Sequence, residues 1–164
     1  RFRSLEAASP NQSRNGEIVK KKAEAVVSPV KVIGKGEPKE ASIAGADVVV
    51  CAGRGLKKAE DFSMIQELAD ALGGVVGATR PLVDDGWISK DHQVGFSGTI
   101  VKPKLYIGCG VSGSPQHLAG MRESGTIVAI NSDPSVALFR AADYAVVGDL
   151  YEIVPQMIEQ LKKG

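Results

Sequence analysis

The sequence has few cysteines and no long apolar run. Its two cysteines, Cys51 and Cys109, do not have the CxxC or Cys/His spacings of zinc sites, and they are too few for a disulfide framework. We therefore predict no metal site and a reducing compartment such as the cytoplasm. No apolar run approaches the roughly 20 residues of a membrane-spanning helix, and no signal-peptide pattern opens the chain, so we expect no direct membrane insertion.

The sequence also lacks a strong excess of charge. Its net charge is +1 at pH 7, which argues against the large basic surface that nucleic acids select, so we expect no nucleic-acid partner. With 164 residues, of which 43% are hydrophobic and 24% charged, it is typical of a globular protein of about one domain. The chain begins at Arg1 rather than at Met, so we expect a fragment or a processed product.

Charge divides the chain near Ala41. Residues 1–40 hold nine Lys and Arg against five Asp and Glu, whereas residues 41–164 hold 11 against 14. The stretch EIVKKKAEAVVSPVKVIGKGEP in the first part interleaves β-branched residues with lysines, which predicts one or two short edge strands. We expect residues 1–40 to be linker strands or the tail of another domain, and residues 41–164 to be the main domain.

The second part alternates short apolar runs with helical periodicity. Ile65, Leu68, Ala69 and Leu72 form one apolar helical face, and Asp149 with Glu152 can form a capping box at the start of a last helix. Ser-Pro at 114–115 and Asp-Pro at 133–134 each predict a helix start. The predicted buried strands are DVVVC (47–51), GVVGA (74–78), KLYIG (104–108), TIVAI (126–130) and YAVVG (144–148).

This alternation predicts an α/β fold: a Rossmann-like or flavodoxin-like parallel sheet with helices on both faces, preceded by the short N-terminal strands. Ligands of such sheets bind beyond the carboxyl ends of the strands, so the turns there are the candidate sites. After the third strand, Gly108, Gly110 and Gly113 match GxGxxG. Asp133 follows about 20 residues later, where the motif expects an acidic residue that binds the ribose of the nucleotide. The motif indicates NAD or, because other strands precede it, adenine-nucleotide binding more generally; a glycine turn needed only for packing is the alternative.

Two other turns carry arginines. Arg54 lies between glycines in CAGRGL, where its guanidinium either reaches a pyrophosphate or adenine or is simply solvated. Thr79 and Arg80 follow the second strand, and we expect Arg80 to point toward the cleft or toward a carboxylate such as Asp84. The next residue is a proline, which we expect to prevent immediate continuation as a helix.

A hydroxyl and two histidines complete the candidates. Ser97 lies in the long connection DHQVGFSGTIVKP, and long ordered loops are often functional. His117 lies near the start of the helix after the glycine turn, where it is either a solvated or capping side chain or a donor to a ligand carbonyl. His92 is interpreted as structural.

Taken together, these motifs resemble the alpha subunit of electron-transfer flavoproteins. LYIGCGVSGSPQHLAG followed by TIVAIN is similar to that family's signature, and GRGL, GATR, QVGFSG and ADYAVVGDL match its other blocks in order and approximate spacing. The resemblance covers residues 46–164, the C-terminal FAD-binding domain. Residues 1–40 are similar to the last strands of the family's N-terminal domain, most of which the chain would then lack.

The resemblance implies FAD as the cofactor and a set of contacts. It places the Ser97 hydroxyl at the flavin N5 and His117 at the pyrimidine carbonyl. Phe96 and Pro115 depart from the residues usual in the family. The implied FAD-binding residues are Arg54, Thr79, Arg80, Val94, Gly95, Phe96, Ser97, Ser112, Gly113, Ser114, Pro115, Gln116 and His117, with Asn131, Asp149 and Leu150 at the adenosine end.

The resemblance also implies a function. Such a protein is an electron carrier rather than an enzyme: it pairs with a beta subunit, accepts electrons from flavoprotein dehydrogenases such as acyl-CoA dehydrogenases and passes them to a downstream acceptor. The expected location is the cytoplasm, or the mitochondrial matrix in a eukaryote. One alternative is the NAD-binding Rossmann domain of an oxidoreductase, which leaves GATR, QVGFSG and GDL unexplained. Another is a domain that binds adenine nucleotide for assembly alone or has lost its flavin.

Overall fold

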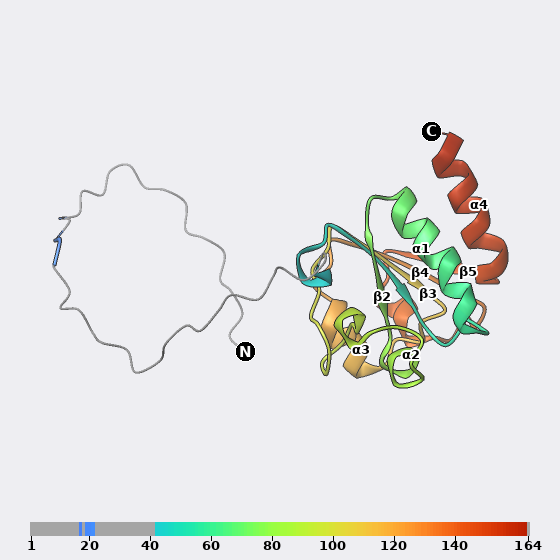
Figure 1. Cartoon of the computed structure of the whole chain (residues 1–164), viewed down its shortest axis with the longest axis horizontal. Helices are drawn as coiled ribbons and strands as arrows, with labels where there is room; N and C mark the ends of the chain where they lie inside the picture. The colour runs from blue at the N-terminus through green and yellow to red at the C-terminus, as the bar shows by residue number, and fades with distance from the viewer. Residues whose placement is uncertain (1–16, 18, 22–41, 164) are drawn as a thin grey trace. The chain divides into compact units, whose positions relative to one another are not determined.

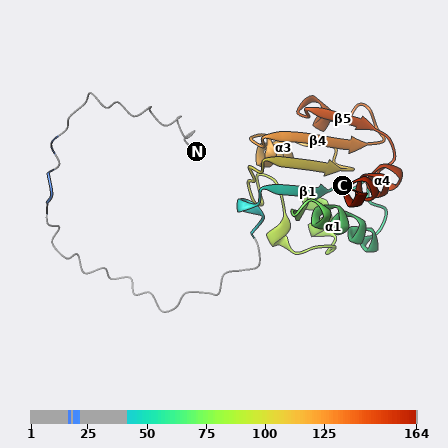
Figure 2. The same ribbon diagram turned by 90° about the horizontal axis from the view of Figure 1, so that it is seen from above.

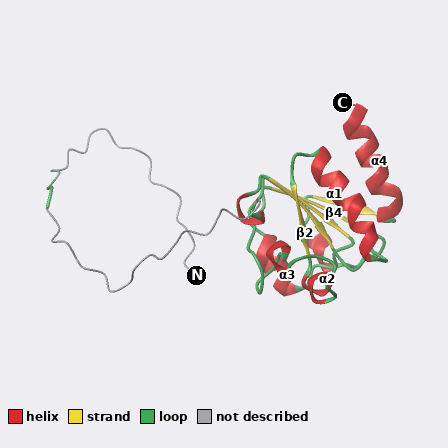
Figure 3. Ribbon diagram, in the orientation of Figure 1, coloured by secondary structure: helices red, strands yellow, loops and turns green. Residues whose placement is uncertain are grey.

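The computed structural model describes residues 17, 19–21 and 42–163. Within these residues, parallel strands form one sheet in the order β2-β1-β3-β4-β5 (Figure 3). This flavodoxin-like order confirms the predicted α/β class, and it places a topological switch point between β1 and β3. The edge strands predicted within residues 17–38 and the boundary near Ala41 lie almost wholly outside the described residues and stay predictions. The strands are β1 (Val48–Ala52), β2 (Val75–Ala78), β3 (Leu105–Cys109), β4 (Thr126–Asn131) and β5 (Tyr144–Val147).

Helices cover both faces of the sheet (Figures 1 and 2). The helices α1 and α4 pack side by side on one face, which we call the α1/α4 face. The opposite face, which we call the α3 face, is covered by α3, by residues 94–101 of the connection between β2 and β3, and by Leu138. The helices are α1 (Phe62–Ala71), α2 (Arg80–Asp84), α3 (Pro115–Met121) and α4 (Leu150–Lys163), and 3₁₀ turns span Ile43–Gly45, Ala59–Asp61, Lys90–His92 and Ala137–Arg140.

Residues of β1 alternate between the two hydrophobic cores, as the two-residue period of a strand requires. Val50 packs in the core of the α1/α4 face, and Val49 and Cys51 pack in the core of the α3 face. The predicted apolar face of α1 is confirmed at Ile65 and Leu68, which are fully buried. Both faces of β1 are therefore buried, and β1 is an interior strand between β2 and β3.

Three local predictions were wrong. Asp133 and Pro134 do not begin a helix, because the Asp133 carboxylate accepts hydrogen bonds from the backbone N–H and the hydroxyl of Ser135 and so closes a turn. The proline after Arg80 does not prevent a helix: α2 begins at Arg80 with Pro81 in its first turn, where a proline needs no N–H partner. The third error concerns β5, which was expected to be buried. Because β5 pairs with β4 at the edge of the sheet, Tyr144 and Val147 are 64% and 58% exposed.

Candidate cofactor-binding site

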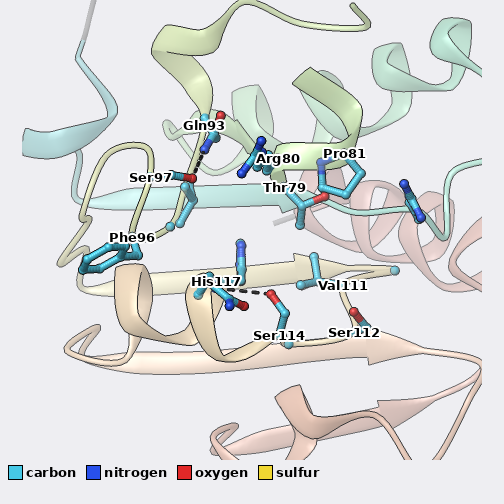
Figure 4. Close-up of a pocket in the computed structure, with 16 residues that line it drawn as sticks. Thr79, Arg80, Pro81, Gln93, Phe96, Ser97, Val111, Ser112, Ser114 and His117 are labelled. Atoms are coloured by element: carbon cyan, nitrogen blue, oxygen red, sulfur yellow. Dashed lines mark hydrogen bonds between the residues drawn. The ribbon is translucent and has the colours of Figure 1, made fainter. Parts of the chain in front are cut away.

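A pocket of about 410 Å³ lies at the carboxyl ends of β1, β2 and β3, beside the switch point. Its volume falls within the roughly 300–1,000 Å³ of small-molecule sites. Figure 4 shows two walls of the pocket. One wall is formed by the segments after β2, with Thr79, Arg80, Gln93 and Ser97, and the other is formed by the turn and helix after β3. The predicted site residues that line it are Arg54, Thr79, Arg80, Val94, Gly95, Phe96, Ser97, Ser112, Gly113, Ser114, Gln116 and His117.

Glycine allows the turns after β1 and β3 to touch through their backbones. The Gly55 N–H donates to the Gly110 carbonyl at 3.0 Å, and a Cβ on Gly110 would lie 2.6 Å from the Gly55 Cα. Gly110 also has a φ of +64°, which side chains disfavour. Gly108 differs from its interpretation as a phosphate-turn glycine: it lies inside β3, where a Cβ would meet the Leu138 side chain at 2.7 Å. The GxGxxG match is thus one packing glycine followed by a true glycine turn.

The start of α3 points its first turn at the pocket. The Ser114 hydroxyl accepts a hydrogen bond from the His117 backbone N–H at 3.4 Å, and Pro115 occupies the first turn, which confirms the predicted helix start. Gln116 and His117 therefore line the pocket from a fixed helical turn, whereas Pro115 does not line it.

The loop before β3 packs directly on α3. The Phe96 N–H donates to the Gln116 carbonyl at 2.8 Å, and a Cβ on Gly120 would lie 2.4 Å from the Gly95 Cα. Gln93 is buried and donates from its side-chain amide to the Ser97 hydroxyl at 2.9 Å. Phe96 itself is 75% exposed at one end of the pocket (Figure 4). The helix thus orders the loop, in which residues 93–95 are buried and residues 96–98 are exposed.

Two buried polar atoms at the pocket lack partners. Across the described ranges, the buried side-chain nitrogen and oxygen atoms without a hydrogen bond are the Thr79 hydroxyl oxygen and the His117 Nδ1. Both residues line the pocket. Buried polar groups are almost always hydrogen-bonded, so an unpartnered pair in one pocket indicates where a polar ligand belongs.

His117 is a neutral side chain. It is only 5% exposed, so its interpretation as a solvated residue was wrong. Burial lowers the pKa of His117 from 6.5 to about 4, and attraction to the Val94 carbonyl offsets part of that effect. That carbonyl does not have the geometry of a hydrogen bond to Nδ1, so Nδ1 still lacks a partner. On the other side of the ring, Nε2 lies 2.7 Å from the Tyr106 hydroxyl. At neutral pH the ring therefore offers the pocket a hydrogen-bonding atom and no charge.

The positive charges of the pocket are arginines. Arg80 satisfies both of its predicted positions: it lines the pocket, and its Nε donates to the Asp84 carboxylate at 3.1 Å. Arg54 lines the pocket from the turn after β1. His92 is structural as predicted, because its Nδ1 lies 2.8 Å from the Val76 carbonyl and fastens the loop to β2.

The predicted adenosine-end residues lie beside the Gly110 turn rather than in the lining of the pocket. Asn131 donates to the Val111 carbonyl at 3.2 Å. The Asp149 carboxylate accepts from the Tyr151 N–H at 2.9 Å and so caps α4, but not through Glu152 as the predicted capping box requires. Leu150 is buried. Their contact with a cofactor stays a prediction, as it does for the residues inside the pocket.

Sequence reasoning missed four residues that line the pocket: Pro81, Gln93, Gly110 and Val111. Gln93 is the one with a distinct polar role, because it holds Ser97. Its position at the head of the QVGFSG block was the available signal. Gly110 was recognised as part of the glycine motif but was not assigned to the site.

A flavodoxin-like sheet with a glycine-turn pocket at its switch point defines a nucleotide-cofactor-binding domain. Residues 42–122 match the model of the electron transfer flavoprotein FAD-binding domain. The chain belongs to the electron-transfer flavoprotein alpha-subunit family, and its cofactor is FAD. The pocket fits this cofactor, since it combines a glycine turn, two arginines and two unpartnered buried polar atoms.

Curated relatives agree with this assignment. The chain is 47% identical to the electron transfer flavoprotein subunit alpha of Thermoanaerobacterium thermosaccharolyticum, over 97% of this chain and 49% of the relative. It is 54% identical to the mitochondrial electron transfer flavoprotein subunit alpha of Dictyostelium discoideum, over 74% of this chain and 34% of the relative. It is 43% identical to the electron transfer flavoprotein subunit alpha of Megasphaera elsdenii, over 92% of this chain and 46% of the relative. The chain spans about half or less of the length of these relatives. The NAD-binding alternative receives no support from them.

Among the described residues, no helix is long and apolar enough to span a membrane.

The two cysteines are buried and free, and burial raises the pKa of each to about 12. Neither thiol is therefore activated as a nucleophile.

Proposed function

We propose that this chain holds FAD for an electron carrier that accepts electrons from flavoprotein dehydrogenases, such as acyl-CoA dehydrogenases, and delivers them to a downstream acceptor. The observation that carries this proposal is the pair of unpartnered buried atoms, Thr79 Oγ1 and His117 Nδ1, in a pocket between glycine turns. The carrier turns over no substrate of its own. The names of the relatives, all electron transfer flavoproteins, support this reading.

Bound FAD would supply reversible electron storage, with negative charge on the N1/O2 edge of its flavin after reduction. His117 would donate a hydrogen bond toward that edge, and Arg80 would add a positive charge nearby. The hydrogen bond from the buried His117 ring would be stronger than in water, whereas the Arg80 side chain is 67% exposed and paired with Asp84, so its charge would add a weaker, solvent-screened attraction. Both interactions favour the reduced state. Asn131, Asp149 and Leu150 would serve the adenosine end.

Ser97 is well arranged to donate to the flavin N5. Its oxygen already accepts a hydrogen bond from the Gln93 amide at 2.9 Å, so its own proton is available to the pocket. Gln93 is buried, which fixes this arrangement. The residues Val94 to Phe96 would form the rest of this flavin-facing loop, with the exposed Phe96 ring at the mouth.

The complete carrier would pair with a beta subunit. The exposed Phe96 ring beside the pocket is suited to cover by another chain. Within this scheme residues 41–164 are the FAD-binding domain and residues 1–40 the tail of the preceding one. We place the protein in the cytoplasm or, in a eukaryote, in the mitochondrial matrix, since the Dictyostelium relative is named mitochondrial.

An absorbance spectrum followed by titration with FAD and with NAD tests the proposal. We expect flavin bands or saturable FAD binding that NAD does not compete with. His117→Ala should weaken binding of reduced FAD by about 10- to 100-fold, the worth of a hydrogen bond to a charged group. Tyr144→Ala, which truncates an exposed ring on the edge strand β5 outside the pocket, is the control. A chain that binds NAD and ignores FAD would contradict the proposal.

A further inference from the structure

Tyr106 is a residue of the sheet whose side chain contacts His117, a residue of the pocket lining. It lies in β3 on the α3 face and is fully buried. Its neighbour Gly108 gives its ring room, because a Cβ there would lie 3.2 Å from the Tyr106 Cε1. The hydroxyl ends 2.7 Å from the His117 Nε2, with the two rings tilted by 56°. A core residue with no pocket contact of its own thus holds the one buried histidine of the pocket lining.

The protons of this pair can be assigned from chemistry. The Tyr106 hydroxyl has one proton, and burial raises the pKa of that group well above its ordinary value, so the proton stays. The hydroxyl interacts with the His117 Nε2 and with the Cys51 thiol, and sulfur is a weak acceptor. The hydroxyl therefore donates to Nε2. A neutral imidazole that accepts at Nε2 carries its proton on Nδ1.

We propose that Tyr106 is a positioning residue that holds His117 in the Nδ1–H tautomer, so that the pocket receives a donor instead of a lone pair. The consequence for the cofactor rests on the proposed function, because only a donor stabilises the negative edge of a reduced flavin. In the opposite tautomer, Nε2–H would donate to the Tyr106 oxygen. The tyrosine proton would then have only sulfur to bond, and Nδ1 would repel the negative edge.

The first test needs neither a variant nor FAD. Long-range ¹H–¹⁵N spectra of the ¹⁵N-histidine-labelled chain distinguish the two tautomers, and His117→Gln assigns the signals between the two histidines. At pH 7 we expect His117 to show protonated Nδ1 and unprotonated Nε2. Protonated Nε2 in the unaltered chain would overturn the inference.

The second test removes the hydroxyl. Tyr106→Phe should lower the ratio of Nδ1–H to Nε2–H at least about five-fold, since a buried hydrogen-bonding group loses its partner. Tyr144→Phe is the matched control, because Tyr144 is an exposed tyrosine on the edge strand β5. A ratio unchanged in a folded Tyr106→Phe chain would overturn the inference.

Titration with oxidised and reduced FAD separates this inference from the proposed function. Tyr106→Phe should weaken binding of reduced FAD more than that of oxidised FAD, while Tyr144→Phe changes neither. If the chain shows the Nδ1–H tautomer and its loss in Tyr106→Phe but binds no FAD, the tautomer assignment is supported and the proposed function fails. Equal weakening of both redox states would overturn the role of the tautomer in recognising the reduced cofactor.

Discussion

The two faces of the sheet are filled by different kinds of side chain. The α1/α4 face buries an apolar cluster that includes Leu68 and Val154, and it leaves a groove of about 630 Å³ along α4. The α3 face also buries apolar residues, but there the Tyr106 hydroxyl contacts the buried His117, and Cys51 packs in the same core, whereas Cys109 packs on the α1/α4 face. The larger hollow is thus apolar, and the smaller one holds the unpartnered polar atoms.

This difference shows that cavity volume alone does not identify the cofactor site. The groove is lined by residues such as Leu72, Val128 and Met157, which supply burial but little that orients a ligand. Two polar side chains of the pocket are held by a hydrogen bond from a residue behind them: Ser97 by Gln93, and His117 by Tyr106. Such support from behind is what precise binding requires. One face is therefore expected to control stability and the other cofactor chemistry.

The largest effect should come from the α1/α4 face. Leu68→Ala removes a fully buried side chain and should lower the free energy of unfolding by about 2–5 kcal/mol, because the lost burial adds to the cavity left behind. Urea denaturation measures it. FAD affinity per folded molecule should stay within about two-fold, since the pocket lies elsewhere. Leu161→Ala, at the 41% exposed rim of the groove, should cost far less and is the control.

The α3 face should make stability depend on pH through His117. The pKa of His117 falls from 6.5 to about 4 on folding, so between these pH values the folded chain binds fewer protons than the unfolded chain. The contribution of His117 to the free energy of unfolding is therefore fully present above pH 6.5. As pH falls from 6.5 toward 4, up to about 3 kcal/mol should be lost, at about 1.4 kcal/mol per pH unit. Denaturation curves across this range check the slope.

His117→Gln isolates that contribution. Carboxylates titrate in the same range and contribute equally to both proteins, so the informative quantity is the difference between the two stability profiles. The difference should grow as the pH falls, with the unaltered chain losing more. Parallel profiles would mean that His117 is not buried in its neutral form. The α3 face would then not differ from the α1/α4 face in burying a titratable side chain.

The fold was largely readable from local patterns. The β-branched runs and the spacing of Ile65 and Leu68 determine strand and helix type through periods of two and 3.6 residues. Exposure of β5 could not be read in this way, because it depends on strand order, which is a non-local property. The failed helix start at Asp133 had a local cause: a side chain that can cap a helix can equally close a turn.

The site was predicted less evenly. Parallel strands bring their carboxyl ends to one edge, so Arg54, Thr79 and the Gly110 turn could be expected to meet there. The hydrogen bond from Tyr106 to His117 could not be expected, because it joins a strand residue to a helix residue across the interior. The repeat of apolar residues around Tyr106 predicted only a buried strand.

The smallest effect should come from the other unpartnered atom of the pocket. Thr79→Val replaces the hydroxyl by a methyl group of similar size, and no cap is lost, because the Thr79 side chain makes no capping hydrogen bond to α2. Stability of the FAD-free chain should rise by up to about 1 kcal/mol, since an unsatisfied buried hydroxyl disappears, while FAD affinity should fall by about three- to ten-fold. Thermal unfolding without FAD and a titration with it measure the two changes. Higher stability together with lower FAD affinity would mark Thr79 as a cofactor-binding residue. Lower stability with unchanged affinity would mean that its hydroxyl stabilises the fold and has no part in binding, like the apolar side chains of the α1/α4 face.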